Sequence, residues 1–475
     1  MVFSSVIFLL YFLPLFLVVY HISADRLKNY VILIFSLFFY SWGAPKFIFT
    51  LLVLTGIDFF VVKKMFSSEK IKQRKIWLTI SILINMGLLF YFKYSNFFID
   101  NFNIVLSNFG IKNILWTKLV LPIGISFFTF ETLTYSIDAY RRKITPLKEL
   151  KDYYLYIFMF PKLIAGPIVR FSLIENQMVK RHIKSGDFLN GFLRFTLGLG
   201  KKILIANILG KFADDSINQL TNGLAIDSTI SWLAILSYTF QIYFDFSGYS
   251  DMAIGIGQMI GFRFPENFDN PYCATSITDF WRRWHMTLGM WMKEYLYIPL
   301  GGNKVNSKLR LYLNLWLVFL LSGLWHGAAW NFILWGAFHG FFLILDRMFL
   351  LRLLNRLPRI LSIIFTFITV MIGWVLFRIE NFQLIRKFLK SMFRFNFNQH
   401  YEIFTSEFTV TIIFAALFSF FTIFSIGKKI QEKIYFSEKK ESLQFNYALV
   451  SIFLLIVSVS YITSTGFNPF IYFRF

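Results

Sequence analysis

The sequence predicts an all-α fold, a polytopic bundle of transmembrane helices. Of the 475 residues, 56% are hydrophobic and only 16% are charged, below the roughly 25% of soluble domains. Apolar runs of about 17 to 22 residues recur along the chain, and about 20 helical residues cross a bilayer. The runs are continuous and do not alternate as in a membrane barrel, so we expect helices.

The first apolar run, residues 2–20, has no Lys or Arg before it and no small-residue cleavage site behind it. A secretory signal would carry both. We therefore expect this run to be the first membrane helix.

The formal net charge of +22 raises the possibility of a nucleic-acid partner. The basic residues, however, gather in short clusters between apolar runs, at 63–75, 141–151, 180–184, 304–310, 347–359 and 428–440. This is typical of cytoplasmic loops under the positive-inside rule. We therefore expect no nucleic-acid partner. We expect the chain to be surrounded by a lipid bilayer, with both of its ends outside the cytoplasm. The clusters can also attract anionic lipid or a phosphate-bearing donor.

Several common kinds of site are excluded. Cys273 is the only cysteine, and the six histidines form no metal-binding spacing, so we expect no metal. The sequence lacks a Walker motif, a dinucleotide fingerprint, a nucleophile elbow and an internal repeat. Residues 1–475 therefore read as one membrane domain without a soluble module. The hydrophilic stretches 96–112 and 378–407 are expected to be extracytoplasmic loops or surface helices.

Two aspartates, Asp245 and Asp251, interrupt the apolar segment 241–257. A charge at membrane depth costs several kcal/mol unless it is paired or hydrated. The sequence leaves open an ion pair, a helix break or a role in shaping a polar tunnel. The following segment is expected to be a loop because of its turn formers, which are Pro265, Asn267, Asn270 and Pro271.

Segment 276–302 predicts an amphipathic helix at the membrane interface. Thr278 or Asp279 can cap its start. Aromatic and apolar residues then recur at helical spacing, and cations fall largely on other faces. A purely structural helix is one interpretation. The position of His285 within the apolar stripe favours a functional one.

A second histidine, His326, lies in the apolar segment 311–345. A helix over 311–321 rises only about 16 Å, too little to cross a bilayer, which places 322–327 inside the membrane. Gly323 and Gly327 leave space for a kink or for a substrate. An ionisable group at that depth is a functional candidate, although a lone histidine is more often a satisfied core residue.

The remaining histidines carry less signal. His339 lies about 20 Å further along the helix axis, so we expect a packing or hydrogen-bonding role. His21, His182 and His400 fall in expected loops. The residues alone do not choose among these histidines.

Two motifs make that choice: FWRRWHMTLGMWMKEYLYIPLGGNK at 280–304 and SGLWHGAAWNFILWGAFHG at 322–340. Together they resemble the bacterial membrane-bound O-acyltransferase family, with support in the same order from 121–138, 160–170 and 241–255. The YIPLGGN stretch is most similar to the alginate and peptidoglycan O-acetyltransferase branch, and less similar to the D-alanyl transferase of teichoic acid. Glu131, followed by Thr132, departs from relatives that often carry glutamine there.

The resemblance implies a bundle of about eleven spans with interfacial and re-entrant helices. It places the family's essential histidine on His326 and the second motif histidine on His285. It implies that acetyl arrives as a cytosolic thioester, such as acetyl-CoA, and leaves toward an SGNH-type acetyltransferase or the polysaccharide outside. The expected location is the bacterial cytoplasmic membrane, with no bound cofactor.

On this basis neutral His326 is expected to be the general base, assisted by His285, with an acyl-histidine as the competing route. Candidate ligands for the donor phosphates are Arg282, Arg283, Lys162 and Arg170, which can equally line the cytoplasmic interface. Candidate tunnel or supporting residues are Asp245, Asp251, Ser322, Trp325 and Asn331. Ser322 is a candidate donor to the thioester oxygen.

Three other functions stay open at this level. A proton-coupled transporter or flippase would use the same buried groups to move an envelope precursor. D-alanyl transfer to teichoic acid would use the same acyl chemistry. A non-catalytic scaffold would not need His326.

Overall fold

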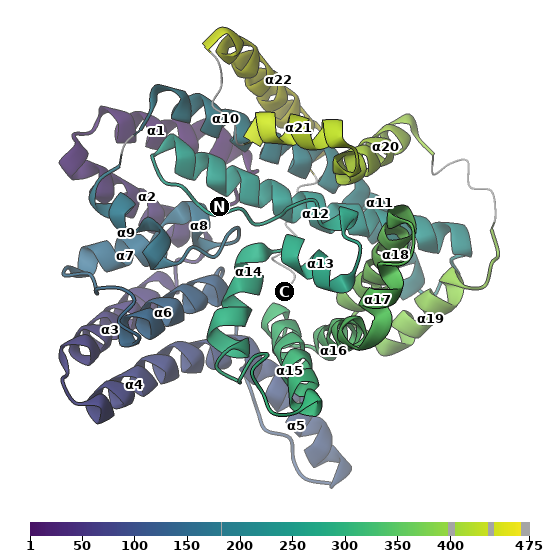
Figure 1. The fold of residues 1–475 in the computed structure, drawn as a ribbon, viewed down its shortest axis with the longest axis horizontal. Helices are drawn as coiled ribbons and strands as arrows, with labels where there is room; N and C mark the ends of the chain where they lie inside the picture. Colours follow the sequence, from purple (N-terminus) through teal and green to yellow (C-terminus); the bar gives the residue numbers. More distant parts are fainter. Residues whose placement is uncertain (182, 398–403, 436–440, 467–475) are drawn as a thin grey trace. The chain divides into compact units, whose positions relative to one another are not determined.

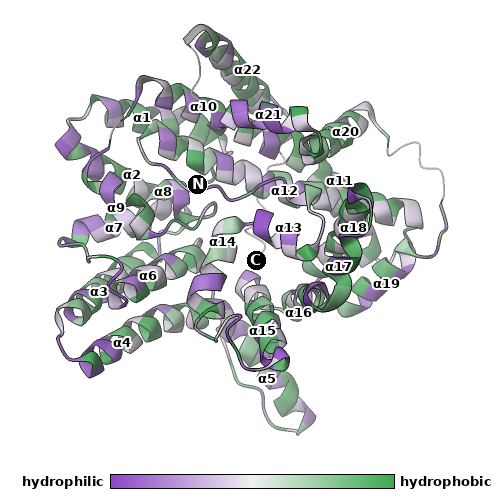
Figure 2. Cartoon of the chain, in the orientation of Figure 1, coloured by the Kyte–Doolittle hydropathy of each residue, from purple (hydrophilic) through white to green (hydrophobic). Residues whose placement is uncertain are grey.

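The computed structural model describes residues 1–181, 183–397, 404–435 and 441–466, and in these residues every regular element is a helix (Figure 1). The expected all-α fold is therefore confirmed. Hydrophobic residues dominate the long helices, whereas α21, Ser425–Tyr435, is largely hydrophilic (Figure 2).

Six helical stretches in the described part of the chain are long and apolar enough to cross a membrane. They are Ile71–Asn108, Lys308–His326, Trp330–Leu354, Arg359–Arg378, Ser406–Ile423 and Leu443–Thr465. The expected first membrane helix is a shorter apolar helix, Phe8–Ile22. The protein is accordingly a multi-pass membrane protein.

Within the expected single membrane domain, the chain forms two compact units. The first contains Met1–Phe188 and Ile256–Pro265. Its helices are α1 Leu13–Ile22, α2 Lys28–Gly43, α3 Ile48–Ser67, α4 Ile71–Leu89, α5 Ser95–Asn108, α6 Ile125–Tyr140, α7 Leu150–Phe158, α8 Phe160–Leu163 and α9 Phe171–Val179. The segment 96–112 thus begins as helix α5.

Phenylalanine packing holds the start of this first unit together. The ring of Phe160 is fully buried and lies 5.0 Å from that of Phe16 and 5.3 Å from that of Phe12, edge to face in both cases. Such geometry places a ring edge against a ring face, which the aromatic quadrupole favours. Phe160 therefore joins the start of α8 to the first apolar helix.

The second unit contains Leu189–Gly255 and Glu266–Phe475. Helix α10, Ser185–Gly200, continues through a π-helical stretch, Lys201–Ala206, into α11, Asn207–Thr221. The later helices are α12 Ser228–Met259, α13 Ile277–Arg283, α14 Met286–Trp291, α15 Lys308–His326, α16 Trp330–Leu345, α17 Leu351–Leu354, α18 Arg359–Arg378, α19 Phe382–Met392, α20 Ser406–Phe420, α21 and α22 Glu441–Thr465. Residues Phe382–Met392 confirm a surface helix within 378–407.

The two aspartates of α12 are compensated by cations of the π-helical stretch before α11. The Lys202 ammonium lies 2.9 Å from an oxygen of Asp245, and the Lys201 ammonium lies 2.6 Å from an oxygen of Asp251. Arg194 adds a 3.0 Å contact to Asp251. Of the alternatives left open by the sequence, the structure contains the ion pairs, and α12 runs through both positions unbroken.

Candidate active site

His326 is the last residue of α15, at the turn of a helical hairpin with α16. Ser307 caps the start of α15 by accepting the backbone N–H of Arg310 at 3.2 Å. The helix then continues for 19 residues, or about 28 Å, so the expectation of a short helix over 311–321 was wrong. The break comes after the histidine, where residues 327–329 leave the helix before α16 begins.

The two legs of the hairpin touch at glycines. A Cβ on Gly323 would lie 2.2 Å from the carbonyl oxygen of Phe332, and one on Gly336 would lie 2.3 Å from that of Phe319. These distances are far inside van der Waals contact. The space beside Gly323 is thus filled by α16, which corrects the expectation that it admits a kink or a substrate.

Aromatic rings surround His326, which is buried. Its ring centroid lies 4.9 Å from Trp325, 5.2 Å from Trp335 and 5.4 Å from Phe377, and all three contacts are edge to face. Trp335 comes from α16 and Phe377 from α18. Three helices therefore fix the imidazole.

His285 lies between α13 and α14, where the sequence predicted a continuous helix. That prediction was wrong, because α13 ends at Arg283, Trp284 is extended and His285 adopts the left-handed conformation, with φ +43° and ψ +53°. The predicted cap was also displaced, since the Ser276 side chain accepts the N–H of Asp279. A non-glycine residue in this conformation costs about 1 to 2 kcal/mol, so other contacts must hold it.

Asn267 supplies those contacts. Its side-chain oxygen Oδ1 lies 3.0 Å from Nδ1 of His285 and accepts the Thr287 hydroxyl at 2.8 Å and the Thr287 backbone N–H at 3.3 Å. Its carbonyl oxygen accepts the N–H of Met286 at 2.9 Å. Its amide donates to the Ser250 hydroxyl at 3.1 Å.

These bonds determine the tautomer of His285. A backbone N–H can only donate, so the Asn267 atom facing Thr287 is the oxygen. An oxygen of an amide can only accept, so Nδ1 of His285 carries the proton of the neutral ring. Nε2 therefore holds the lone pair, which is the atom able to accept a proton or a hydrogen bond.

The structure brings His285 and His326 together. His326 ends one of the helices that are long enough to span a membrane, whereas His285 belongs to none of these helices. Burial lowers the pKa of His285 well below its ordinary value, and the neighbouring His326 lowers it further. Trp325, next to His326 in the chain, lies with its ring centroid 6.3 Å from that of His285. The site thus combines a buried neutral imidazole with a second imidazole close by.

The other predicted tunnel residues are buried near the hairpin or on α12. Ser322 and Trp325 lie in the last turns of α15. Asn331 is fully buried in the first turn of α16, and its amide donates to the carbonyl of Phe377 at 3.2 Å. Asp245 and Asp251 lie on α12, in the ion pairs described above.

The four candidate phosphate ligands differ in availability. Arg282 is exposed, whereas Arg283 forms a 2.9 Å ion pair with Asp279. Burial lowers the pKa of Arg283, but the hydrogen bond to Asp279 and the charges of Asp279 and Asp269 together raise the pKa overall. Lys162 is fully buried in an ion pair with Glu131, and Arg170 is half-buried. Lys162 and Arg170 belong to the first unit, and Arg282 and Arg283 to the second.

The thiol of Cys273 is poorly suited to act as a nucleophile. Cys273 is buried and directs its sulfur to the carbonyl of Ser419 at 3.3 Å, and burial raises the pKa of its thiol. A raised pKa keeps a thiol from acting as a nucleophile. No group of three or more potential metal ligands occurs among the described residues.

His339 supports the site from outside it. Its Nδ1 accepts the indole N–H of Trp281 at 3.3 Å, which agrees with the expected hydrogen-bonding role. Its ring also lies 5.1 Å from that of Trp335, the tryptophan that packs on His326. His21 lies in the last turn of α1, so the expectation of a loop there was wrong, and His182 and His400 fall outside the described residues.

The sequence did not reveal three supporting residues. Asn267 was interpreted only as a turn former, although it holds His285. Trp335 and Phe377, which pack on His326, look like ordinary apolar helix residues. The one available signal was the amide of Asn267 in a loop close to the first histidine motif.

The fold and the site are those of a multi-pass helical protein in which two buried histidines, His285 and His326, lie close together. Residues 101–386 match the profile of the membrane-bound O-acyltransferase family. Both motif histidines fall within these residues. The chain belongs to this family and is an acyltransferase.

Relatives refine this placement. The chain is 42% identical over 398 residues to a probable alginate O-acetylase, AlgI, of Azotobacter vinelandii, covering 83% of this chain and 78% of the relative. It is 37% identical over 431 residues to the peptidoglycan O-acetyltransferase of Helicobacter pylori, covering 83% and 80%. A teichoic acid D-alanyltransferase of Bacillus subtilis is 28% identical over 55% of this chain and 69% of the relative.

Proposed function

We propose that this protein transfers an acetyl group from a cytosolic thioester to a polysaccharide outside the bacterial cytoplasmic membrane. The observation that carries the proposal is the pair of buried imidazoles, His285 and His326, of which His285 is neutral with its lone pair on Nε2. The names of the relatives at 37% and 42% identity support acetyl as the acyl group and an envelope polysaccharide as the acceptor.

The chemistry is an acyl transfer in which the imidazole of His326 carries one proton from the acceptor hydroxyl to the leaving thiolate. His326 accepts the proton of the acceptor's hydroxyl group, and the hydroxyl oxygen bonds to the carbonyl carbon of the thioester. The carbon–sulfur bond then breaks, and the proton passes to the departing thiolate. General-base help is typically worth about 10² to 10⁴ in rate. His285 assists by accepting a hydrogen bond at Nε2, and Ser322 donates to the thioester oxygen.

Transfer from the cytosol to the outside of the membrane requires an acyl donor on the cytosolic side and a receiver on the outer side. Acetyl-CoA fits as the donor because it is a soluble thioester whose phosphates suit exposed cations. Arg282 is the strongest candidate ligand for these phosphates, because Arg283 and Lys162 are already paired with carboxylates. An SGNH-type acetyltransferase outside the membrane is the proposed receiver where the polysaccharide is not acetylated directly.

An acyl-histidine at His326 is the competing route, in which the imidazole attacks the thioester before the acceptor arrives. Labelled acetyl that stays on purified protein, and is absent from His326→Ala, would support it. D-alanyl transfer is the weaker alternative, since that relative covers only 55% of the chain. Transport without acyl chemistry fits poorly with membership of an acyltransferase family.

The decisive measurement is the ester content of envelope polysaccharides in cells carrying His326→Ala. We expect the loss of the ester with unchanged protein level in the membrane. His21→Ala is the matched control, because His21 belongs to neither histidine motif, and it should leave the ester intact. Intact ester in His326→Ala would reduce the chain to a scaffold and refute the proposal.

A further inference from the structure

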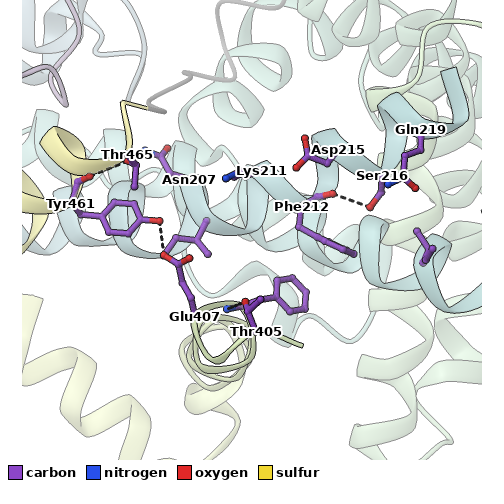
Figure 3. A pocket seen from close by; sticks show the side chains of 13 residues that line it. Asn207, Lys211, Phe212, Asp215, Ser216, Gln219, Thr405, Glu407, Tyr461 and Thr465 are labelled. Atoms are coloured by element: carbon purple, nitrogen blue, oxygen red, sulfur yellow. Dashed lines mark hydrogen bonds between the residues drawn. The ribbon is translucent and has the colours of Figure 1, made fainter. Parts of the chain in front are cut away.

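A polar groove lies in the second unit, away from both histidines in sequence. It has a volume of about 620 Å³ and is lined by α11, the start of α20 and the end of α22 (Figure 3). Binding sites for small molecules typically have about 300 to 1,000 Å³. The groove is therefore large enough for a small molecule or a short stretch of a polymer.

One wall of the groove is a polar stripe on α11. Lys211, Asp215 and Gln219 follow each other at four-residue spacing, so they share one face of the helix, and all three are exposed. Within the described residues, none of these three side chains is committed to a hydrogen bond or an ion pair in the chain. They are therefore available to a ligand.

The opposite wall orients a carboxylate. Glu407, in the first turn of α20, accepts the hydroxyl of Tyr461 from α22 at 2.7 Å through one of its two oxygens (Figure 3). Thr465 lies one turn beyond Tyr461 on the same helix. The bond keeps the carboxylate of Glu407 at the groove.

The groove also has an apolar part. Phe212 of α11 and Phe408 of α20 both line it, and their ring centroids lie 4.7 Å apart. Carboxylates, an amide and an ammonium group beside aromatic carbon suit a sugar, because its hydroxyls need bidentate polar partners and its C–H face needs an apolar one. One cation against two carboxylates leaves the groove with a net negative charge, which disfavours a polyanion.

From this chemistry we propose that the groove binds an uncharged, hydroxyl-rich saccharide. The positive-inside pattern gives the side of the membrane. The far end of α20 leads into α21, which carries Lys428, Lys429 and Lys433, so the end with the groove is expected outside. The biological role of this saccharide binding rests on the proposed function. It specifies the acceptor of the acetyl group as a neutral sugar polymer and not a polyuronate.

The test is calorimetric titration of the full-length protein in lipid nanodiscs. The ligands are an N-acetylated chito-oligosaccharide and an oligouronate of the same length. We expect the chito-oligosaccharide to bind at least about tenfold more tightly than the oligouronate. Asp215→Ala and Glu407→Gln should each weaken it about tenfold, which is the usual effect of losing a charged hydrogen-bond partner.

The controls separate this proposal from the proposed function. Asn218→Ala changes an exposed residue of α11 that does not line the groove, and it should bind as the unchanged protein does. Equal binding of the oligouronate, no binding of either glycan, or displacement by added phosphatidylethanolamine would overturn the saccharide assignment. His326→Ala should keep full glycan binding, so a failure of acyl transfer leaves this result unaffected.

The side of the membrane has its own measurement. Cys273 is buried, so a single new cysteine such as Thr465→Cys can be labelled selectively in cells by an impermeant maleimide. Labelling from outside is expected. Labelling that requires opened membranes would place the groove in the cytoplasm and refute an extracytoplasmic saccharide.

Discussion

Asn267 holds His285 in the left-handed conformation through its side-chain oxygen, 3.0 Å from Nδ1, and through its carbonyl, which accepts the N–H of the next residue. Because the side-chain oxygen of Asn267 can only accept a hydrogen bond, the proton of the neutral His285 ring is on Nδ1. A residue in a loop therefore determines which nitrogen of the imidazole carries the lone pair. Under the proposed function Asn267 is a positioning residue, because it orients His285 through hydrogen bonds.

The first prediction concerns this positioning. Asn267→Leu removes the acceptor for Nδ1, so the ring can rotate and exchange tautomers. We expect kcat to fall about 10- to 100-fold with little change in KM, which is the usual loss when an outer hydrogen-bond partner is removed. Asn267→Asp keeps an acceptor and should retain more activity. Equal losses in both variants would indicate a merely structural role.

The second prediction concerns pH. Because burial lowers the pKa of His285 in the folded state, the unfolded chain binds a proton near pH 6.5 that the folded chain does not. Stability is then present above about pH 6.5 and declines as the pH falls below it. Thermal unfolding of the purified protein between pH 8 and pH 5 measures this decline. His285→Gln should flatten it, and an unchanged slope would contradict a buried neutral imidazole.

The third prediction concerns the glycine contact between α15 and α16. Gly323→Ala places a Cβ against the Phe332 carbonyl, so the hairpin must separate or fail to fold. We expect a large loss of folded protein in size-exclusion chromatography. Gly87→Ala in α4 is the matched control, because nothing lies within 4 Å of its Cβ and alanine favours a helix by about 1 kcal/mol. Normal folding of Gly323→Ala would show that the legs are further apart.

The fourth prediction concerns the buried pair of Lys202 and Asp245. Lys202→Met leaves a buried carboxylate without its cation, which typically costs about 3 to 5 kcal/mol. The double variant with Asp245→Asn removes both charges and should recover much of that loss, as measured by thermal unfolding. Lys28→Met breaks a pair with the exposed Asp25, and we expect less than about 1 kcal/mol there. A double variant as unstable as the single one would refute the pairing.

The sequence predicted a bundle of apolar membrane helices, because backbone polar groups exposed to hydrocarbon are costly. For the buried aspartates it predicted only that some compensation is needed, and the ion pair was one of the alternatives it left open. It did not identify Lys201 and Lys202 as the partners, since they lie on another helix and only packing brings them to α12. Periodicity also missed the break at Trp284 and His285. That break depends on hydrogen bonds from Asn267, whose contribution exists only after the loop has folded onto α12.

Site prediction was limited in the same way. The choice of His326 over His339 came from a motif resemblance, because both histidines lie in apolar helices and look alike in sequence. The aromatic contacts of Trp335 and Phe377 with His326 join three helices. No spacing within one helix encodes such a contact.

Under the proposed function, the backbone contact at Gly323 and Gly336 has a consequence for acyl groups of different size. Neither leg of the hairpin can yield without carrying the other, so the imidazole at its apex keeps a fixed position. Under the proposed function, room for a larger acyl chain next to His326 comes from the α18 side, where Phe377 packs. Substitutions that widen acyl specificity should accumulate there, and the hairpin itself should resist them.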